Sequence, residues 1–295
     1  MMKYRRIQRS YLFVLSLTII GLIIFNSCQS TPKHNNEEEW IALFDGSNYE
    51  DWTPKFKGSE LGVNYKNRFV YDDSLLSVRY TAIDTFKGNF GHLYYKNKFS
   101  YYKLRAKYRF VGDQMTGGPG WAFRNNGLML HCQEPATLGL EQDFPISLEL
   151  QLLGGAGTGD RTTANLCTPG TNVVKGDSLF RPHCVSSTSN TYHGDQWVEV
   201  EALVLGDSLV QHIMEDQVVM EFNKPSLGGG NVAGHNETKF VEGTPLKEGY
   251  ISIQAETHPI DFESIELLNL CGCMDEKATN YKDYYVKADN STCEY

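Results

Sequence analysis

The stretch "ISLELQL", residues 146–152, alternates aliphatic and polar side chains. The aliphatic residues are Ile146, Leu148, Leu150 and Leu152, and the polar residues between them are Ser147, Glu149 and Gln151. Successive side chains of an extended strand point to opposite faces, so this pattern predicts a strand with one buried and one polar face. The polar face either meets water or lines a binding site. In the first case Glu149 and Gln151 are solvated surface residues, and in the second they contact a ligand.

Similar β-prone stretches recur along most of the chain. They are residues 69–80 ("FVYDDSLLSVRY"), 101–110 ("YYKLRAKYRF"), 127–133 ("GLMLHCQ"), 196–222 and 249–268. Turn residues separate them, and no stretch carries the apolar stripe of an amphipathic helix. The 295 residues include 17 Tyr, 15 Phe and 27 Gly but only ten Pro, which favours short strands joined by tight turns. We predict one all-β domain over residues 40–270, a jelly-roll sandwich of two antiparallel sheets.

The N-terminus has the composition of an export signal. A basic segment, "MMKYRRIQRS", precedes an apolar run, "YLFVLSLTIIGLIIF", that is shorter than the ~20 residues of a membrane span. The run ends in "FNSCQS", so residues 1–27 resemble a bacterial lipoprotein signal peptide with Cys28 as the lipidated residue; the alternative is an uncleaved anchor. Residues 28–39 then form a flexible tether. We expect a lipid anchor to the membrane and a place in the cell envelope, on the outer-membrane, periplasmic or cell-surface side.

The charge balance limits the classes of partner. The chain carries 27 basic and 36 acidic side chains, a net charge of −9. Loss of Lys3, Arg5, Arg6 and Arg9 with the signal peptide gives 23 − 36 = −13. Such an acidic chain disfavours nucleic acid and anionic lipid headgroups as ligands, whereas neutral polar molecules such as carbohydrates stay open.

Six cysteines remain once Cys28 is assigned to the lipid. An exported protein folds where disulfides form, and we favour the pairs Cys167 with Cys184 and Cys273 with Cys293, although spacing alone does not fix the connectivity. Cys132 lies in an apolar strand pattern, which indicates a buried free thiol. The cysteine and histidine spacing fits no zinc finger.

Residues 271–295 differ in composition from the rest and form a predicted small Cys/Asp/Asn-rich appendage. Its Asp275, Asn280, Asp289 and Asn290 offer oxygen ligands for calcium, but the spacing is not that of an EF-hand. Turns made by Asp and Asn around a disulfide are the preferred interpretation.

Two further stretches repeat the alternation of residues 146–152. Leu128, Leu130 and Cys132 alternate with Met129, His131 and Gln133, and Ile251, Ile253 and Ala255 alternate with Ser252, Gln254 and Glu256. Each polar residue taken singly is an ordinary solvent-facing side chain. Together they predict a sugar-binding cleft, with amides for hydroxyl groups and with Trp52, Trp121 and Tyr192 as stacking platforms. The sequence lacks nucleophile-elbow, Walker, HExxH and dinucleotide-binding motifs.

Several stretches together resemble the 3-keto-disaccharide hydrolase family, first described as a domain of unknown function. They are "WIALFDGSNYEDW", "YYKLRAKYRF", "RNNGLMLH", "LELQLLGG", "YHGDQWVEVEALV" and "GYISIQAETHPIDFESIELL". The resemblance covers residues 40–270 and implies a concanavalin-like jelly roll. The chain departs from the family pattern at "LLGG", where an acidic residue often follows, and at Glu263, which replaces an arginine.

The resemblance implies cleavage of a glycosidic bond beside a 3-keto group. The ketone acidifies the hydrogen at C2, so a base removes it, the C1 oxygen leaves by β-elimination, and water adds to the enone. The predicted catalytic residues are Glu149, His131 and Glu256, with Glu149 and His131 as base and acid. Arg161 or a bound divalent cation would stabilise the enolate. The predicted substrate-binding residues are Gln151, Gln254, Arg161, Asn126, His258 and Trp121, and His258 is a further candidate acid.

Three alternatives stay open at this stage. An ordinary glycosidase would need two carboxylates about 5–9.5 Å apart, which Glu149 and Glu256 could supply. A lectin-like module would bind carbohydrate without chemistry. A structural envelope protein would leave the polar faces as solvated surface. The sequence requires no cofactor and leaves the identity of any metal undetermined.

Overall fold

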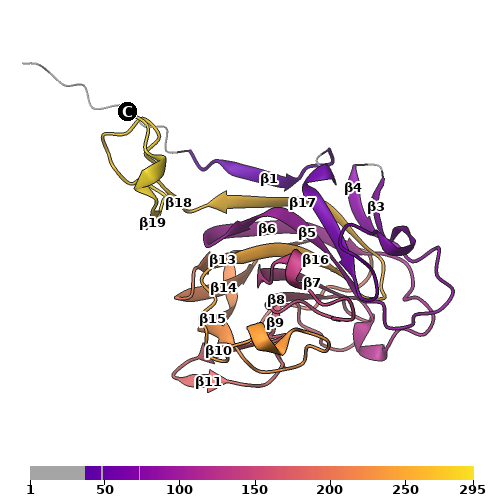
Figure 1. The fold of residues 1–295 in the computed structure, drawn as a ribbon. Helices are drawn as coiled ribbons and strands as arrows, with labels where there is room; N and C mark the ends of the chain where they lie inside the picture. The colour runs from indigo at the N-terminus through magenta and orange to yellow at the C-terminus, as the bar shows by residue number, and fades with distance from the viewer. Residues whose placement is uncertain (1–36, 48, 73) are drawn as a thin grey trace, which may run out of the picture. The chain divides into compact units, whose positions relative to one another are not determined.

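The computed structural model describes residues 37–47, 49–72 and 74–295 (Figure 1). The chain divides into residues 1–33 and residues 34–295, and the described residues belong to the second part. The predicted signal peptide, Cys28 and all but the last three residues of the predicted tether lie outside the described residues. Within the described part of the chain, no helix is long and apolar enough to span a bilayer.

Two antiparallel sheets make up the fold. The larger sheet has ten strands in the order β11-β10-β15-β14-β13-β6-β17-β4-β3, with β1 also paired to β17. Its strands are β1 (Trp40–Phe44), β3 (Phe69–Asp72), β4 (Leu75–Val78), β6 (Tyr101–Phe110), β10 (Thr171–Lys175), β11 (Ser178–Phe180), β13 (Val198–Leu205), β14 (Leu209–Met214), β15 (Gln217–Leu227) and β17 (Ile260–Asn269).

The smaller sheet has seven strands in the order β12-β9-β8-β7-β16-β5-β2. Its strands are β2 (Trp52–Phe56), β5 (Gly91–Phe99), β7 (Asn125–Cys132), β8 (Leu148–Leu153), β9 (Asn165–Cys167), β12 (Cys184–Val185) and β16 (Gly249–Ala255). Short 3-10 turns occur at η1 (Tyr49–Asp51), η2 (Tyr65–Asn67), η3 (Gly120–Ala122), η4 (Pro135–Thr137), η5 (Glu237–Lys239) and η6 (Asn290–Thr292), and the described residues contain no α-helix. The predicted all-β, concanavalin-like jelly-roll sandwich is confirmed.

One hydrophobic core fills the space between the sheets. The smaller sheet contributes the aliphatic faces predicted from its alternating stretches: Leu128, Leu130, Leu148, Leu150, Leu152, Ile251, Ile253 and Ala255. Each fully buried Leu or Ile contributes about 1.5–3 kcal/mol to folding. Ile146 does not join them, because β8 begins only at Leu148. We call the other side of this sheet, which carries Glu149, Gln151 and Gln254, its outer face.

A β-bulge interrupts the alternation of β7. Met129 pairs with Ser252 and Cys132 pairs with Tyr250, so three steps along β7 match two steps along β16. The extra residue is His131, whose φ is +47°. Beyond a bulge, the side chains of a strand change faces.

The bulge overturns two predictions about β7. Cys132 is the buried free thiol that the sequence predicts. It does not, however, share the core-facing side of β7 with Leu128 and Leu130, because it lies on the outer face with Met129 and Tyr94. His131 turns inward, where its ring meets the edge of Tyr102 and its Nε2 lies 3.0 Å from the carbonyl oxygen of Gly206. The prediction that His131 shares the polar face is therefore wrong, because it assumed unbroken alternation.

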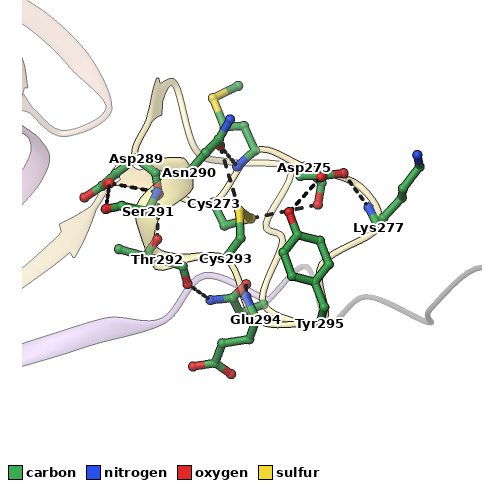
Figure 2. Close-up of a disulfide and its surroundings, with 12 residues drawn as sticks. Cys273, Asp275, Lys277, Asp289, Asn290, Ser291, Thr292, Cys293, Glu294 and Tyr295 are labelled. Carbon is green, nitrogen blue, oxygen red and sulfur yellow. Dashed lines mark hydrogen bonds between the residues drawn. A yellow bond between two sulfur atoms is a disulfide. The ribbon is translucent and has the colours of Figure 1, made fainter.

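The C-terminal appendage is held by turns and by a disulfide. Figure 2 shows the bond between Cys273 and Cys293, with the Asp275 carboxylate accepting hydrogen bonds from Lys277 N at 3.0 Å and from the Tyr295 hydroxyl at 2.9 Å. Asp289 likewise accepts from the backbone and hydroxyl of Ser291. The carboxylates are thus engaged in turns, as the preferred interpretation of this segment expects. The segment begins with β18 (Cys271–Gly272), which pairs in parallel with β19 (Lys287–Ala288).

The last residues of the predicted tether belong to the fold. Glu38 pairs with Lys103 of β6 at 3.2 Å, and Glu39 forms an ion pair with Lys282 of the appendage. Residues 38 and 39 therefore belong to the folded domain, because a disordered chain would not hold these fixed pairs.

Candidate active site

The polar side chains of β8, β16 and the loops beside them enclose one hollow on the outer face of the smaller sheet. Its volume is about 620 Å³, which is within the range of small-ligand sites. We call it the Glu149 pocket, and it is lined by Trp121, Asn125, Phe144, Glu149, Gln151, Leu153, Arg161, Cys167, Pro169, His183, Cys184, Gln254 and Glu256. Six of the residues predicted from the sequence meet here: Glu149, Glu256, Gln151, Gln254, Arg161 and Trp121.

Glu149 is the second residue of β8 and is only 5% exposed. Its carboxylate lies over Gly127 of β7, where an added Cβ would come within 2.6 Å of Glu149 Oε1, so a side chain at position 127 would push the carboxylate away. Oε1 is buried and has no hydrogen-bond partner among the described residues. Burial raises the pKa of Glu149 to about 8 because the charged form loses its hydration.

Glu256 follows the last residue of β16 and is 3% exposed. Burial raises its pKa well above the ordinary value, the charge of Glu149 raises it further, and the charge of Arg161 lowers it. Two carboxyl groups that repel each other in a buried site do not both ionise near neutral pH. The pair therefore holds at least one proton at pH 7.

Arg161 is fixed beside this pair by backbone oxygens. Its Nη1 donates to the carbonyl oxygens of Gly154 at 2.6 Å and Arg124 at 3.2 Å, and its Nη2 donates to that of Trp121 at 3.4 Å. Among the described residues, no carboxylate forms an ion pair with its guanidinium. Arg161 thus supplies a fixed positive charge to a pocket whose two acids are largely neutral.

Four buried oxygens that line the pocket have no hydrogen-bond partner among the described residues. They are Asn125 Oδ1, Glu149 Oε1, Gln254 Oε1 and Glu256 Oε2. Unpartnered buried polar groups are rare in proteins, and each costs about 1–3 kcal/mol. Their concentration in one hollow indicates a ligand that supplies several hydrogen-bond donors, as the hydroxyl groups of a sugar do.

Aromatic side chains form one wall of the pocket. Trp121 is 55% exposed and stacks on Phe90 with ring centroids 6.0 Å apart, and Phe90 in turn packs against Phe144 at 4.8 Å. A large exposed indole held in place at a pocket rim is a platform for the apolar face of a sugar ring. Opposite, Gln151 accepts a hydrogen bond from Asn165 at 3.3 Å, which orients its amide.

A disulfide closes the end of the pocket beyond β8. Cys167 and Cys184 are bonded and face each other across β9 and β12, and Cys167 pairs with Glu149 across β8 and β9. The disulfide brings His183 into the pocket wall. Enclosure of part of its ring lowers the pKa of His183, so the imidazole is neutral at pH 7.

Five predicted residues do not line the Glu149 pocket. Trp52 is buried in the core, where its Nε1 donates to the Leu43 carbonyl oxygen, and the Tyr192 hydroxyl donates to Glu215, so neither is a stacking platform of this pocket. His131 is turned away by the bulge. Asn126 is fully buried between β7 and β16, where its amide donates to the carbonyl oxygen of Gln254 at 2.7 Å, so it supports the sheet and does not face the ligand. His258 is fully buried between the rings of Phe110 and Phe123, which lowers its pKa to about 4.

The lining residues that the sequence reasoning missed include three with polar or aromatic side chains, Asn125, Phe144 and His183. Asn125 is on the same face as Gly127 and Met129, so the alternation of β7 would have identified it in place of Asn126. His183 directly precedes Cys184, and the expected disulfide would have brought it near β8. Phe144 lies in the loop before β8, and the sequence carries no periodic signal for it.

The described residues contain no cluster of three or more His, Cys, Asp or Glu side chains arranged to hold a metal ion. In the Glu149 pocket, a hard cation would have to rely on two carboxylates and the amide oxygens of Asn125 and Gln254.

A two-sheet jelly roll with a buried acid pair and a stacking wall defines a carbohydrate-active protein. The family model described as a 3-keto-alpha-glucoside-1,2-lyase-like domain matches residues 39–268. The chain belongs to this family. The comparison with curated proteins gives no match.

Several solved structures are similar to the chain at low sequence identity. A protein of Parabacteroides distasonis ATCC 8503, provisionally assigned as a glycosyl hydrolase, is 13% identical over 78% of this chain and 99% of its own, with a TM-score of 0.47. A Bacillus subtilis protein of unknown function with a galectin-like fold is 10% identical over 78% and 94%, with a TM-score of 0.46. The carbohydrate-binding module CBM66 of Bacillus subtilis is 8% identical over 80% and 99%, with a TM-score of 0.36. Similarity at this level identifies neither the activity nor the ligand of this chain.

Proposed function

We propose that the protein cleaves the glycosidic bond of 3-keto-glycosides by elimination and hydration in the Glu149 pocket. The observation that carries the proposal is the pair of buried, unpartnered carboxyl groups of Glu149 and Glu256 beside the fixed charge of Arg161. The family to which the chain belongs is described by a 1,2-lyase activity on 3-keto-α-glucosides, which agrees with this chemistry.

The reaction divides into two steps. In the first, a carboxylate removes the C2 proton, the electron pair forms an enolate towards O3, and the C1–O1 bond breaks as a second group protonates the leaving oxygen. In the second, water adds to C1 of the resulting enone and a proton returns to C2. The sum is hydrolysis, and the pocket needs one base, one acid and a positive charge near O3.

The environments of the two carboxyl groups assign the roles. The charge of Glu149 raises the pKa of Glu256, so we assign Glu149 as the group that ionises first and acts as the base at C2. Glu256 keeps its proton longer, because the charge on Glu149 opposes its ionisation, and it acts as the acid at O1. Arg161 stabilises the negative charge that develops at O3. The acid is therefore Glu256 and not the predicted His131, because His131 does not line the pocket.

The distinguishing experiment compares oxidised and unoxidised sugars. The purified full-length protein is incubated with 3-keto-trehalose and a 3-keto-glucoside, and in parallel with trehalose and the parent glucoside. Release of the leaving sugar or alcohol from the keto substrates alone supports elimination. Cleavage of the unoxidised sugars would indicate the two-carboxylate glycosidase route, and tight binding without cleavage would indicate a lectin-like module.

The role of a divalent cation is tested on the same reaction. We expect activity to survive prolonged dialysis against EDTA, because the pocket offers only two carboxylates and already contains the Arg161 charge. Loss of activity on chelation, restored by Mn²⁺, Mg²⁺ or Ca²⁺, would place a cation among the four unpartnered oxygens. Stabilisation of the enolate would then be assigned to that cation and not to Arg161.

We also propose that the chain is lipid-anchored in the cell envelope through Cys28. The basic and apolar segments before that cysteine support the proposal. Expression in a bacterial host should give a membrane-bound protein, and Cys28→Ala should remove the lipid seen by mass spectrometry. An unlipidated wild-type chain would contradict it.

A further inference from the structure

A second hollow lies at the other end of the outer face of the smaller sheet. Its volume is about 560 Å³, and it shares no lining residue with the Glu149 pocket. We call it the Tyr250 pocket; its walls include Cys132, His235, Phe240, Glu248 and Tyr250. None of its residues takes part in the chemistry proposed above.

The two pockets are too far apart for one small substrate to fill both. Asn125 of the Glu149 pocket and Cys132 of the Tyr250 pocket are seven residues apart on β7, roughly 24 Å at about 3.4 Å per residue. Tyr94 and Met129, which pack against Cys132 in an apolar cluster, occupy the sheet between them. The Tyr250 pocket is therefore a site of its own.

The backbone around the Tyr250 pocket has an irregular shape that the sandwich itself does not require. The bulge at His131 forms its edge and turns Cys132 towards the outer face. At the start of β16, Gly249 approaches the same bulge so closely that an added Cβ would lie 2.3 Å from the His131 carbonyl carbon. Bulges commonly reshape a sheet beside a binding site, and both irregular features of this strand pair border the pocket.

The side chains of the pocket combine apolar surface with polar groups that have hydrogen-bonding capacity left. Phe240 packs against the His235 ring at 5.2 Å, and Tyr250 is partly buried against the apolar cluster. His235 Nδ1 donates to the Val232 carbonyl oxygen at 3.1 Å, which leaves Nε2 as an acceptor in the neutral ring. Among the described residues, the Tyr250 hydroxyl forms no hydrogen bond.

The charged residues that line the pocket are Lys98, Glu134 and Glu248. Glu248 forms an ion pair with Lys98, and both side chains are more than half exposed. The pocket therefore offers aromatic surface, an imidazole acceptor, a phenol and two carboxylates, one of them paired with Lys98. Its one basic and two acidic side chains disfavour an anionic ligand. A neutral pyranose ring matches this combination, because it has an apolar C–H face and several hydroxyl groups.

We propose that the Tyr250 pocket is a second, non-catalytic carbohydrate site that holds a neutral, unoxidised glycosyl unit. Such a site would keep the protein on a glycan while the Glu149 pocket acts on oxidised glycosides, and two linked sites bind a multivalent glycan more tightly than either alone. The proposal concerns different residues from the cleavage reaction and does not depend on it.

The test is isothermal titration calorimetry of the full-length protein with maltotetraose and cellotetraose. We expect at least one of them to bind, and Phe240→Ala and Tyr250→Phe each to weaken that binding about tenfold or more. Val241→Ala is the matched control, because Val241 adjoins Phe240 and is 65% exposed but does not line the pocket. Tyr250→Phe removes only a hydroxyl, so it keeps the test valid if Phe240→Ala impairs folding.

The outcomes separate this proposal from the proposed function. Binding that survives Trp121→Ala but is lost in the Tyr250-pocket variants supports the second site, whether or not keto-glycosides are cleaved. Failure of both oligosaccharides to bind would overturn it, as would binding that depends on Trp121 alone. Binding of free p-nitrophenol without binding of either sugar would also overturn it, because the pocket would then be an apolar site.

Discussion

Asp261 of the larger sheet and Glu149 of the smaller sheet are both almost inaccessible to water, at 1% and 5% exposure, yet their surroundings are opposite. Asp261 accepts hydrogen bonds from Ser77 at 2.7 Å and from Arg109 at 3.0 Å, and it forms an ion pair with Arg79. Glu149 Oε1 has no such partner among the described residues.

The pKa values follow these surroundings. Burial by itself would raise the pKa of Asp261, but the hydrogen bonds from Arg79, Ser77 and Arg109 bring it below its ordinary value. The pKa of Glu149 rises to about 8 because burial acts without compensation. A buried carboxylate that is fully paired stabilises the fold, whereas one left unpaired is available for a ligand or a proton.

The largest expected effect is on catalysis. Glu149→Gln removes the base and should lower kcat/KM for a 3-keto-glucoside by roughly 10²–10⁴-fold. Asp261→Asn makes the same chemical change in the other sheet and should leave kcat/KM within about threefold, measured on folded protein. Equal losses in the two variants would show that Glu149 acts through the structure alone.

The second effect is on stability at Asp261. Asp261→Asn should destabilise the protein by about 3 kcal/mol at pH 7 in urea denaturation, because two arginines lose their buried partner. Since the pKa of Asp261 is lowered, its contribution is present above the pKa of an unfolded Asp and is lost as the pH falls through the native value. The difference between wild type and variant should therefore shrink towards pH 2.

The sequence anticipated part of this contrast. The alternation of residues 146–152 placed Glu149 and Gln151 on one face, and that of residues 251–256 did the same for Gln254 and Glu256, because both strands are regular. The same reasoning failed at His131 because a single extra residue in β7 is invisible to a pattern of period two. Phe144 entered the pocket through a loop, and loop positions depend on tertiary packing that no local pattern encodes.

The third effect is a gain of stability at the pocket. The raised pKa of Glu149 means that its protonated form is favoured in the native state, so the carboxyl group costs stability as the pH rises from about 4.5 towards 8. Glu149→Gln should stabilise the fold on the order of 2 kcal/mol at pH 8 and have little effect at pH 4. A destabilised Glu149→Gln variant at pH 8 would show that the carboxylate is well solvated or paired.

The smallest effect is a shift in the pH dependence of the reaction. With Glu149 as the base, kcat/KM for a keto substrate should rise with pH through a value near 8 and fall again as Glu256 loses its proton. Arg161→Met should move the alkaline limb upward, because the charge that favours ionised Glu256 is gone. A kcat/KM that does not change between pH 6 and pH 9 would contradict the account in which Glu149 and Glu256 together hold at least one proton at pH 7.

Hydrogen exchange at C2 of the substrate tests the central claim most directly. The full-length protein and its Glu149→Gln and Glu256→Gln variants are incubated with a 3-keto-glucoside in D₂O, and deuterium at C2 is measured by NMR in the substrate that remains. The account predicts that Glu256→Gln incorporates deuterium without cleaving the bond, whereas Glu149→Gln does neither. Exchange that persists in Glu149→Gln, or cleavage without any change at C2, would show that Glu149 is not the base of an elimination.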